Sequence, residues 1–422
     1  MNIIYFKQKI VIFSLVFFCI STTAYAIHKD TIHPMFDTEG SNNRSLTTDS
    51  CHSLSPPKEY WLLSLDGGGE RGILHLKTLA ELEKRTGKRI VDMFDGIAGT
   101  SIGGIIATLL TAPDPNNPLK PRYSPQELLD IFFAKRFVMF QPKWFSFNGL
   151  LRTKYKTRGM QYFLFSMLGG NTFKNRWLPT VLVTHDLNSY GVRPFSSIDD
   201  DDYFAKDIAM ATAAAPTYYK PQQIFPINKP NSPGYFVSDG GTCMSTPTHA
   251  GIAMLQKHYN AKPEQIHVLS LGTGLSNVPF NSNNLRSGRG FSWINVLADM
   301  LILGQQSTDI NVASLFLGNR YHRFNPLLEP RLITFDNLSD ANGEALLKAN
   351  KKMLEDRDEE FSKLAKDLSR SADSKEAKTV QDLSIPITFQ SNFFQNSFLW
   401  LIGWHRFQFE TQLVLRYPQN KT

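Results

Sequence analysis

The sequence contains few cysteines and no long hydrophobic run. Among 422 residues there are three cysteines, Cys19, Cys51 and Cys243. Cys19 lies in an apolar stretch near the N-terminus. The two that remain form neither a disulfide scaffold nor a structural zinc site by themselves. They allow one disulfide, and two unpaired thiols are the alternative. The apolar stretch covers residues 10–20, which is shorter than the about 20 residues of a membrane-spanning helix.

Strong charge of one sign and sequence repeats are also missing. Lys and Arg number 45 and Asp and Glu number 38, for a formal charge of +7, and 42% of the residues are hydrophobic. This balance excludes wholesale disorder, collagen and coiled coil. A nucleic-acid-binding protein usually has a stronger, localised basic excess than a formal charge of +7 implies, so the positions of the basic residues matter more than their sum. No cluster of metal ligands is visible, and the acidic run 199–202 is interpreted as a solvated loop rather than a calcium site.

The first 26 residues are typical of a secretory signal peptide. Lys7 and Lys9 precede the apolar run, no acid accompanies them, and the segment ends in Ala24-Tyr25-Ala26, an A-x-A cleavage pattern. A membrane anchor is the alternative, which the short run disfavours. We therefore expect export to the periplasm, the outer membrane or the medium. Residues 27–57 are polar and irregular and are expected to form a leader or linker.

Alternating strand and helix patterns predict an α/β protein with a mostly parallel sheet. The apolar run 60–65 reads as a strand and is followed by a helix that Gly87 ends; a second strand is expected over 94–100 and its helix over 102–110. Further strands are expected over 178–184, 235–238 and 266–271. Further helices are expected over 207–214, 247–258, 295–318 and 341–370.

A glycine-rich motif follows the first strand. Residues 66–72 read Asp-Gly-Gly-Gly-Glu-Arg-Gly, which has the G-x-G-x-x-G form of a dinucleotide-binding loop. That use requires an acid at the end of a second strand about 20 residues further on, and none of Glu81, Glu83, Asp92 and Asp95 is clearly placed there. The alternative is an oxyanion hole, in which backbone N–H groups of the glycines face a developing negative charge.

A G-x-S-x-G motif lies at the second strand-to-helix turn. It consists of Gly99, Thr100, Ser101, Ile102 and Gly103. In a nucleophile elbow the serine occupies a sharp, strained turn that exposes its hydroxyl. A chance match in a glycine-containing helix cap is the alternative, but the flanking strand and helix patterns favour the elbow.

An acid and several histidines are candidate bases for this serine. Asp239 follows an expected strand and precedes Gly240 and Gly241. An acid in that position faces the active-site edge of an open α/β sheet, whereas a solvated turn aspartate is the alternative. A Ser-His-Asp triad would instead need a histidine, and the candidates are His249, His258, His267, His322 and His405.

The ordered set DGGGERG, GTSIG and DGG resembles the patatin-like phospholipases. Residues 213–219 (AAAPTYY), 269–274 (LSLGTG) and 321–326 (YHRFNP) support the resemblance, which covers about residues 57–370. It implies a three-layer α/β/α fold with a central mostly parallel sheet and no cofactor or metal. The predicted domains are therefore the signal peptide 1–26, the leader 27–57, a patatin-like catalytic domain 58–370 and an aromatic-rich C-terminal extension 371–422.

The resemblance also implies roles for individual residues. Ser101 is the nucleophile and Asp239 its direct base, without a histidine. Gly67, Gly68 and Gly69 supply oxyanion donors, and the supporting motif residues are Asp66, Arg71, Gly72, Gly99, Gly103, Gly240 and Gly241, with Asp66 as a structural cap and Arg71 shaping the loop. Burial is expected to raise the pKa of Asp239.

The implied function is a lipid acyl hydrolase of the phospholipase A or lysophospholipase type, a carboxylic ester hydrolase acting on fatty-acyl esters of glycerolipids. A histidine-dependent carboxylesterase and a catalytically silent lipid-binding protein are the alternatives.

Residues 131–185 form a basic, aromatic-rich segment. It contains nine Lys and Arg, thirteen aromatic residues and no acid. This composition suits an anionic lipid surface, although many of the aromatics are expected in the core. Nucleic acid is the competing interpretation, but the lipase-like motifs and the expected export argue against it, so nucleic acid is not expected as a partner. We therefore expect the segment to contact a membrane or micellar glycerolipid substrate. A second apolar patch, residues 391–404, is expected to pack on the domain or to lie in a lipid interface.

Overall fold

The computed structural model describes residues 58–117, 120–143, 152–275, 290–329, 332 and 334–375, with the backbone alone for 290–302. The signal peptide 1–26, the leader 27–57 and the apolar patch 391–404 lie outside the described residues, as do Cys51, His405 and all of the extension beyond residue 375. Cys243 is half-buried and its thiol is free. None of the helices in the described ranges is long and apolar enough to cross a bilayer.

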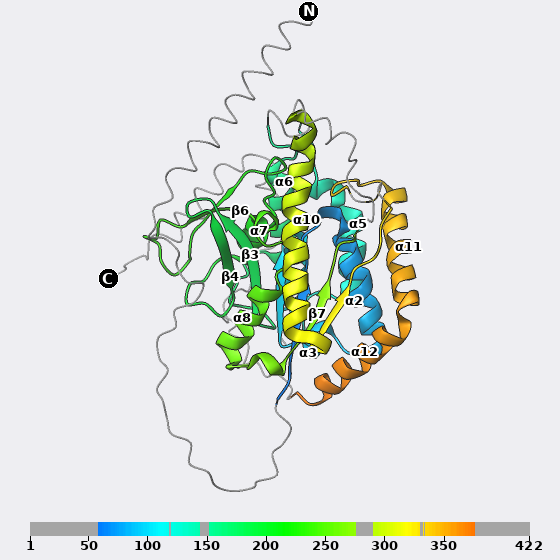
Figure 1. Cartoon of the computed structure of the whole chain (residues 1–422). Helices are drawn as coiled ribbons and strands as arrows, with labels where there is room; N and C mark the ends of the chain where they lie inside the picture. Colours follow the sequence, from blue (N-terminus) through cyan, green and yellow to red (C-terminus); the bar gives the residue numbers. More distant parts are fainter. Residues whose placement is uncertain are drawn as a thin grey trace, which may run out of the picture. The chain divides into compact units, whose positions relative to one another are not determined.

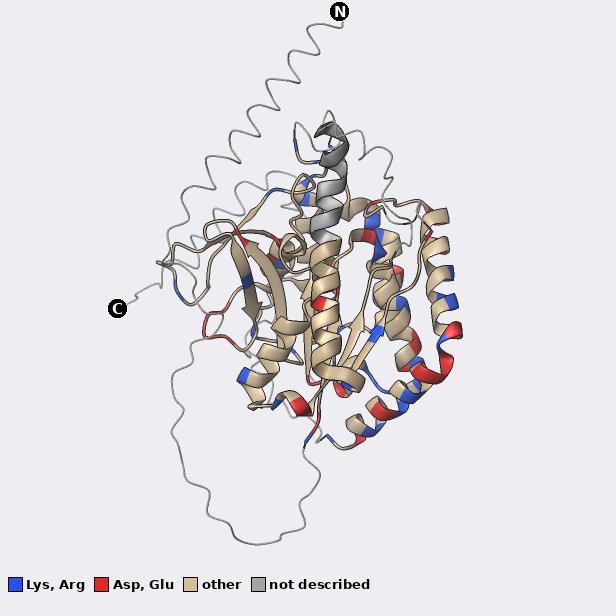
Figure 2. Ribbon diagram, viewed as in Figure 1, with Lys and Arg blue, Asp and Glu red and all other residues tan. Residues whose placement is uncertain are grey.

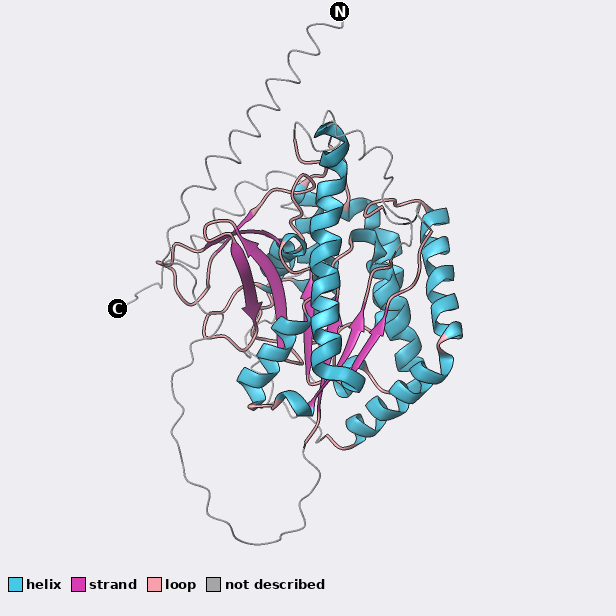
Figure 3. Ribbon diagram, viewed as in Figure 1, coloured by secondary structure: helices cyan, strands magenta, loops and turns pink. Residues whose placement is uncertain are grey.

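An eight-stranded mixed sheet organises the described residues, in the order β5-β6-β3-β2-β1-β7-β8, with β4 paired to β3 (Figures 1 and 3). Neighbouring strands from β3 through β2, β1 and β7 to β8 are parallel, and β4, β5 and β6 join by antiparallel pairing. The bounds are β1 (Tyr60–Leu65), β2 (Gly96–Thr100), β3 (Thr180–Asp186), β4 (Gly191–Ser196), β5 (Gln222–Ile224), β6 (Tyr235–Asp239), β7 (Ile266–Leu271) and β8 (Tyr321–Phe324).

Strand β3 brings the ends of β2 and β6 together. Residues 180–183 of β3 pair with β2, and residues 184–186 pair with β6. Strand β4 pairs with residues 181–186 along one edge of β3. Because a strand has only two edges, β2 and β6 share the other edge of β3. Thr100 at the end of β2 pairs with Val183, and Asp239 at the end of β6 pairs with Thr184. The two strands therefore meet end to end at consecutive positions of β3.

The two faces of the sheet are covered by different helices. Trp61, Leu63 and Leu65 of β1 are buried against the core that contains α2 (Ile73–Thr86) and α4 (Ile102–Leu110). The alternate residues Tyr60 and Leu62 face a second core that contains α8 (Thr248–Tyr259). A strand buried on both faces reads as a continuous apolar run. The three-layer α/β/α fold with a mostly parallel sheet, predicted from the sequence, is therefore confirmed (Figure 3).

The remaining helices include three that the sequence patterns did not indicate, α3, α5 and α6. Their bounds are α3 (Ile90–Met93), α5 (Pro125–Met139), α6 (Thr157–Leu168), α7 (Ala205–Thr212), α10 (Gly290–Leu317), α11 (Asp340–Asp356) and α12 (Asp358–Asp373). The start of α5 carried a local signal, because Ser124 and Glu127 form a capping box with Pro125 at the first helical position.

The single helix expected over 341–370 is two helices, α11 and α12. The break falls at Arg357, whose backbone is non-helical at φ −122° and ψ 30°. Helix α11 packs on α2, whereas α12 packs on α2 and α3, so one straight helix would not cover both. Arg357 holds the corner, since its guanidinium lies 4.1 Å from the centre of the Phe324 ring and donates to the carbonyl of Arg323. Lys, Arg, Asp and Glu gather along both helices in Figure 2.

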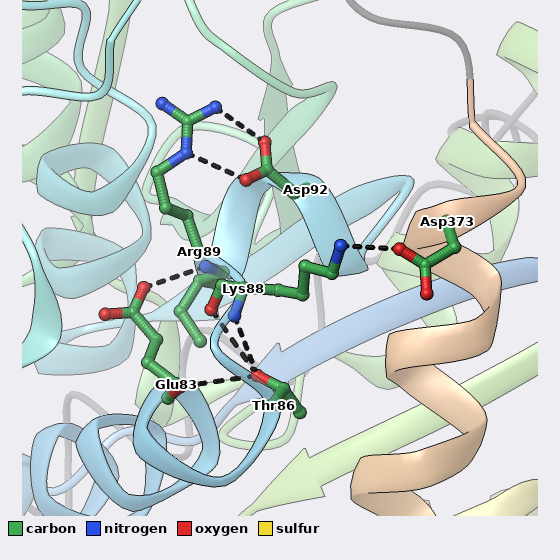
Figure 4. A network of polar contacts seen from close by, with 7 residues as sticks. Glu83, Thr86, Lys88, Arg89, Asp92 and Asp373 are labelled. Atoms are coloured by element: carbon green, nitrogen blue, oxygen red, sulfur yellow. Dashed lines mark hydrogen bonds and ion pairs between the residues drawn. The ribbon is translucent and has the colours of Figure 1, made fainter.

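The turn after α2 is held by a polar network that reaches α12 (Figure 4). Arg89 binds both carboxylate oxygens of Asp92 at 2.8 Å, and Glu83 accepts the N–H of Ile90 at 2.8 Å. Lys88 reaches across to Asp373 at 2.5 Å. Since the Lys88 and Asp373 side chains are both exposed, this ion pair positions the end of α12 and adds at most about 1 kcal/mol of stability.

Candidate active site

Ser101 occupies a strained turn between β2 and α4. Its backbone has φ 55° and ψ −124°, a conformation that a residue with a side chain adopts only at a cost of about 1–3 kcal/mol. The flanking glycines make the turn possible. A Cβ on Gly103 would lie 2.2 Å from the carbonyl oxygen of Leu65, and one on Gly99 would lie 2.5 Å from that of Gly103. Ser101 immediately precedes the first turn of α4, so it lies at the positive end of the helix dipole.

Asp239 is the hydrogen-bond partner of the Ser101 hydroxyl. Ser101 Oγ donates to Asp239 Oδ2 at 2.7 Å, and the N–H of Gly241 donates to Oδ1 at 2.7 Å. The carboxylate is buried with 4% of its surface exposed. Burial raises its pKa from 3.8 to about 6, against the opposing effect of the hydrogen bonds from Ser101 and Gly241. The pairing follows from the end-to-end meeting of β2 and β6, since Asp239 is the last residue of β6.

The candidate histidines have other neighbours. His249 Nδ1 lies 3.9 Å from Asp309, and the rings of His267 and His322 both stack on Trp61. The ring of His258 lies edge-on to Tyr259 near the end of α8. None of these four histidines has a hydrogen bond to the Ser101 hydroxyl, which donates to Asp239, and His405 lies outside the described residues.

His185 lies near the dyad and was not singled out in the sequence. Its Nδ1 is 2.8 Å from Thr242 Oγ1, and Thr242 Oγ1 donates to the carbonyl of Asp239. Because that hydroxyl gives its one proton to Asp239, the Nδ1 of His185 must be the donor in the first bond. His185 therefore supports the turn after Asp239 without contacting the serine.

The glycine loop lies directly beside Ser101. The position that a Cβ would take on Gly67 is 3.3 Å from Ser101 Cβ. The N–H of Gly67 donates to the carbonyl of Ser245 at 3.0 Å, and Thr273 Oγ1 donates to the Gly67 carbonyl at 2.7 Å. Gly67 is thus held from both sides. Within the described residues, the N–H groups of Gly68 and Gly69 donate no backbone hydrogen bond outside their own helix.

Asp66 is fixed at the base of this loop and does not contact the serine. Its Oδ2 accepts from Arg323 at 2.5 Å and from Gln306 at 2.7 Å, and the carboxylate is fully buried. Loss of one partner of a buried ion pair destabilises a protein by about 3–5 kcal/mol. The Asp66–Arg323 pair therefore anchors β8 and the start of the loop to each other.

Arg71 and Gly72 shape the other end of the loop. The Nε of Arg71 donates to the carbonyl of Gly68 at 3.3 Å, and its guanidinium lies 4.5 Å from the centre of the Phe335 ring. Gly72 admits the Ile102 side chain, which would lie 2.5 Å from a Cβ at that position. A Cβ on Gly240 would likewise meet the carbonyl oxygen of Val183.

Three supporting residues were not predicted individually: Thr273, Arg323 and Gln306. Thr273 and Arg323 fall within segments 269–274 and 321–326, which support the family resemblance. The sequence therefore indicated these segments but not the contacts of the two residues. Gln306 lies in the middle of α10, and no feature of the sequence distinguishes it from other helical glutamines.

The basic, aromatic-rich segment 131–185 is divided between the core and the surface. Arg136 and Arg176 are buried, with Arg136 facing Glu70 and Asp340 and Arg176 donating to main-chain carbonyls. Trp144, Phe145 and Phe147 lie outside the described residues. The buried aromatics are Phe132, Phe140, Tyr155, Phe163, Phe173 and Trp177, and the exposed ones are Phe137, Tyr162 and Phe165.

This chain is similar to a known protein family and to several curated proteins. The family model "Patatin-like phospholipase" matches residues 63–252. A cGAMP-activated phospholipase of Pseudomonas aeruginosa is 31% identical over 287 residues, which cover 64% of this chain and 79% of that protein. Patatin-like protein 4 of Arabidopsis thaliana is 32% identical over 249 residues, or 52% of this chain and 61% of that protein. The chain thus spans somewhat less than two thirds of this plant relative.

Two more distant matches complete the comparison. The protein named probable inactive patatin-3-Kuras 1 of Solanum tuberosum is 26% identical over 341 residues, covering 71% of this chain and 89% of that protein. The crystal structure of VipD from Legionella pneumophila has a TM-score of 0.35 and 13% identity, covering 72% of this chain and 68% of that one, and carries no weight here. The family model spans Ser101 and Asp239, the Pseudomonas aeruginosa relative is matched over more than three quarters of its length, and the chain belongs to the patatin-like phospholipase family.

Proposed function

We propose that this protein is a lipid acyl hydrolase of the phospholipase A or lysophospholipase type, which cleaves fatty-acyl esters of glycerolipids through Ser101 and Asp239. The observation that carries the proposal is the 2.7 Å hydrogen bond from Ser101 Oγ to a buried carboxylate at a strained strand-to-helix turn. Membership of the patatin-like family supports the lipid ester as the class of substrate.

The reaction has two steps. In the first, Asp239 accepts the Ser101 proton while Oγ attacks the ester carbonyl carbon, and the alcohol leaves with that proton as the acyl-enzyme forms. In the second, Asp239 takes a proton from water, the hydroxide attacks the acyl-enzyme, and the fatty acid is released as Ser101 regains its proton. The N–H groups of Gly68 and Gly69, together with the N-terminus of α4, would stabilise the tetrahedral oxyanion of each step.

Burial of Asp239 makes a carboxylate a more effective base for this chemistry. A carboxylate with an ordinary pKa is a weak base toward a serine hydroxyl. Its raised pKa of about 6 brings it nearer the range in which general bases act at neutral pH. A histidine is not required to relay the proton, because the carboxylate oxygen already contacts the hydroxyl.

Two assays of the wild-type protein test the proposal. In one the protein is incubated with a fluorophosphonate probe, and in the other with a panel of phospholipids, lysophospholipids and neutral glycerolipids. We expect the probe to label Ser101, identified by peptide mass spectrometry, and fatty acids to be released from at least one lipid class. Labelling without release from any lipid would contradict the lipid substrate. Absence of both would favour a silent lipid-binding protein.

We further propose that segment 131–185 contributes to contact with the lipid phase. The exposed Phe137, Tyr162 and Phe165 lie on α5 and α6, and aromatic side chains partition to membrane interfaces. The buried aromatics of the segment belong to the core, so the proposal is restricted to the exposed ones and to the cations near them. We expect a Phe137→Ser/Phe165→Ser variant to bind phosphatidylglycerol vesicles more weakly than wild type in a sedimentation assay, and equal binding would contradict this contact.

Export of the protein is likewise a proposal, supported by the signal-peptide pattern of residues 1–26. When the full chain is expressed with its N-terminus intact, we expect the exported product to begin at Ile27. N-terminal sequencing of the protein from the periplasmic, outer-membrane and medium fractions measures this. An intact Met1 in protein that stays with the cytoplasmic fraction would contradict export.

A further inference from the structure

Phe335 contacts three consecutive residues of the glycine loop. It lies between β8 and α11 in the chain, and its carbonyl accepts the N–H of Glu70 at 2.8 Å. A Cβ on Gly69, whose φ is 60°, would meet that same carbonyl oxygen, so this close approach requires glycine. The guanidinium of Arg71 lies 4.5 Å from the centre of the Phe335 ring. The place of the far half of the loop, residues 69–71, therefore depends on where Phe335 is held.

Asp336, the next residue, anchors Phe335 to another part of the chain. Its side chain is 5% exposed, and its Oδ2 accepts from Lys154 Nζ and from Tyr155 Oη, each at 2.6 Å. Burial and the neighbouring carboxylate raise the pKa of Tyr155, so the phenol keeps its proton and remains a donor at neutral pH. Hydrogen bonds to an ionised carboxylate are about twice as strong as neutral ones. Asp336 is therefore firmly fixed to residues 154 and 155.

The segment that carries Tyr155 is fastened in turn to the backbone of the base. The N–H of Tyr155 donates to the carbonyl of Tyr218 at 3.0 Å, and the N–H of Tyr218 donates to the carbonyl of Ala215 at 3.0 Å. The adjoining residue, Ala214, accepts the N–H of Asp239 at 3.1 Å. Hydrogen bonds and a single peptide link thus connect this segment to the base.

The near half of the glycine loop is held by other partners. Gly67 is bonded on one side to the carbonyl of Ser245 and on the other to the hydroxyl of Thr273. The proposed oxyanion donors, the N–H groups of Gly68 and Gly69, follow directly after this anchor and directly before the residues that Phe335 holds. Both anchors are therefore needed to fix where these two N–H groups lie relative to the dyad.

We propose that Asp336 is a positioning residue for ester hydrolysis, which holds the oxyanion donors of the glycine loop at a fixed place relative to Ser101 and Asp239. Oxyanion donors are effective only at about 2.7–3.1 Å from the developing charge, so small displacements are costly. This inference rests on the proposed lipid acyl hydrolase function. It adds a residue that lies outside the three motifs DGGGERG, GTSIG and DGG.

Kinetics on a soluble ester, with a matched control, test the proposal. The values of kcat and KM for 4-nitrophenyl hexanoate, per site labelled by the fluorophosphonate, are measured in wild type, Asp336→Ala, Tyr155→Phe and the control Asp95→Ala. Asp95 is matched because its buried carboxylate also pairs with a lysine and accepts a backbone N–H, whereas it lies at the opposite end of β2 from Ser101. Amide hydrogen exchange of residues 66–72 is measured in parallel.

We expect Asp336→Ala to lower kcat by about 10²-fold, the cost of a displacement of about 1 Å. Its KM should be unchanged, because contacts to the oxyanion form only in the transition state. Tyr155→Phe keeps the ion pair of Asp336 with Lys154 and is expected to lose about tenfold in kcat. Hydrogen exchange of residues 66–72 should be faster in Asp336→Ala than in wild type. Both kcat and this exchange should be unchanged in Asp95→Ala.

A kcat of Asp336→Ala that equals the wild-type value, or that falls no further than in Asp95→Ala, would overturn the proposal, as would a rise in KM alone. If Asp336→Ala does not fold, Tyr155→Phe decides, and an unchanged kcat in that variant overturns the proposal. If wild type hydrolyses neither this ester nor any lipid, the proposed function itself fails. Hydrogen exchange of residues 66–72 in Asp336→Ala and Tyr155→Phe then decides whether Asp336 holds the loop.

Discussion

Ser101→Ala is expected to abolish hydrolysis of every lipid substrate and labelling by the fluorophosphonate. Alanine has no oxygen to attack the ester carbonyl, so the acyl-enzyme does not form, and loss of a nucleophile from a catalytic unit of this kind lowers kcat by at least about 10⁴-fold. Released fatty acid, measured at saturating lipid, reports the effect. Substantial residual hydrolysis in Ser101→Ala would show that another residue is the nucleophile.

A matched variant separates the chemistry from the fold. Ser101→Gly also removes the hydroxyl, but glycine adopts the φ of 55° found at this position without strain. We expect Ser101→Gly to be as inactive as Ser101→Ala and more stable toward urea by about 1 kcal/mol. A stability ranking in the opposite order would contradict the strain assigned to this turn, without bearing on the role of the hydroxyl.

Asp239→Asn is expected to lower kcat by about 10²–10⁴-fold, the range contributed by a positioned general base. The amide does not accept the Ser101 proton, whereas its oxygen still accepts the N–H of Gly241. In wild type the base acts as the carboxylate, so kcat/KM is expected to fall as the pH drops through about 6, the raised pKa of Asp239. Full activity of Asp239→Asn, with loss of activity in a histidine-to-alanine variant, would favour a triad.

The same substitution is expected to leave the fold at least as stable at pH 7. Because burial raises the pKa of Asp239 from 3.8 to about 6, the folded state binds more protons than the unfolded state between these pH values. Stability therefore falls as the pH rises through this window, by up to about 3 kcal/mol for two pKa units. Asparagine carries no charge, so the free energy of unfolding of Asp239→Asn relative to wild type should be higher at pH 7 than at pH 4, as measured by urea titration. A marked loss of stability at pH 7 would instead show that the carboxylate holds the fold together.

Local sequence patterns were sufficient to predict the fold class and to indicate Ser101 as the candidate nucleophile. The apolar run 60–65 is typical of a strand buried on both faces, and its alternation with helical patterns indicates a parallel sheet covered by helices. The motif around Ser101 can be recognised in the sequence for a similar reason. A sharp turn between strand and helix requires glycine wherever a Cβ would meet the backbone, and Gly103 meets the Leu65 carbonyl at such a point. These constraints act between residues that are near in sequence or that occupy a stereotyped turn.

The partners of those residues depend on contacts between distant segments. That Ser101 meets Asp239 and not a histidine is decided by the sharing of one edge of β3 by β2 and β6, and register along a strand is not encoded in either segment alone. The same holds for Asp66 with Arg323 and Gln306, which are separated from it by 257 and 240 residues. The break between α11 and α12 likewise depends on the surfaces of α2 and α3. A sequence pattern indicates the periodicity with which side chains are buried. Which distant residue each side chain contacts depends on the surfaces that come together when the helices pack on the sheet.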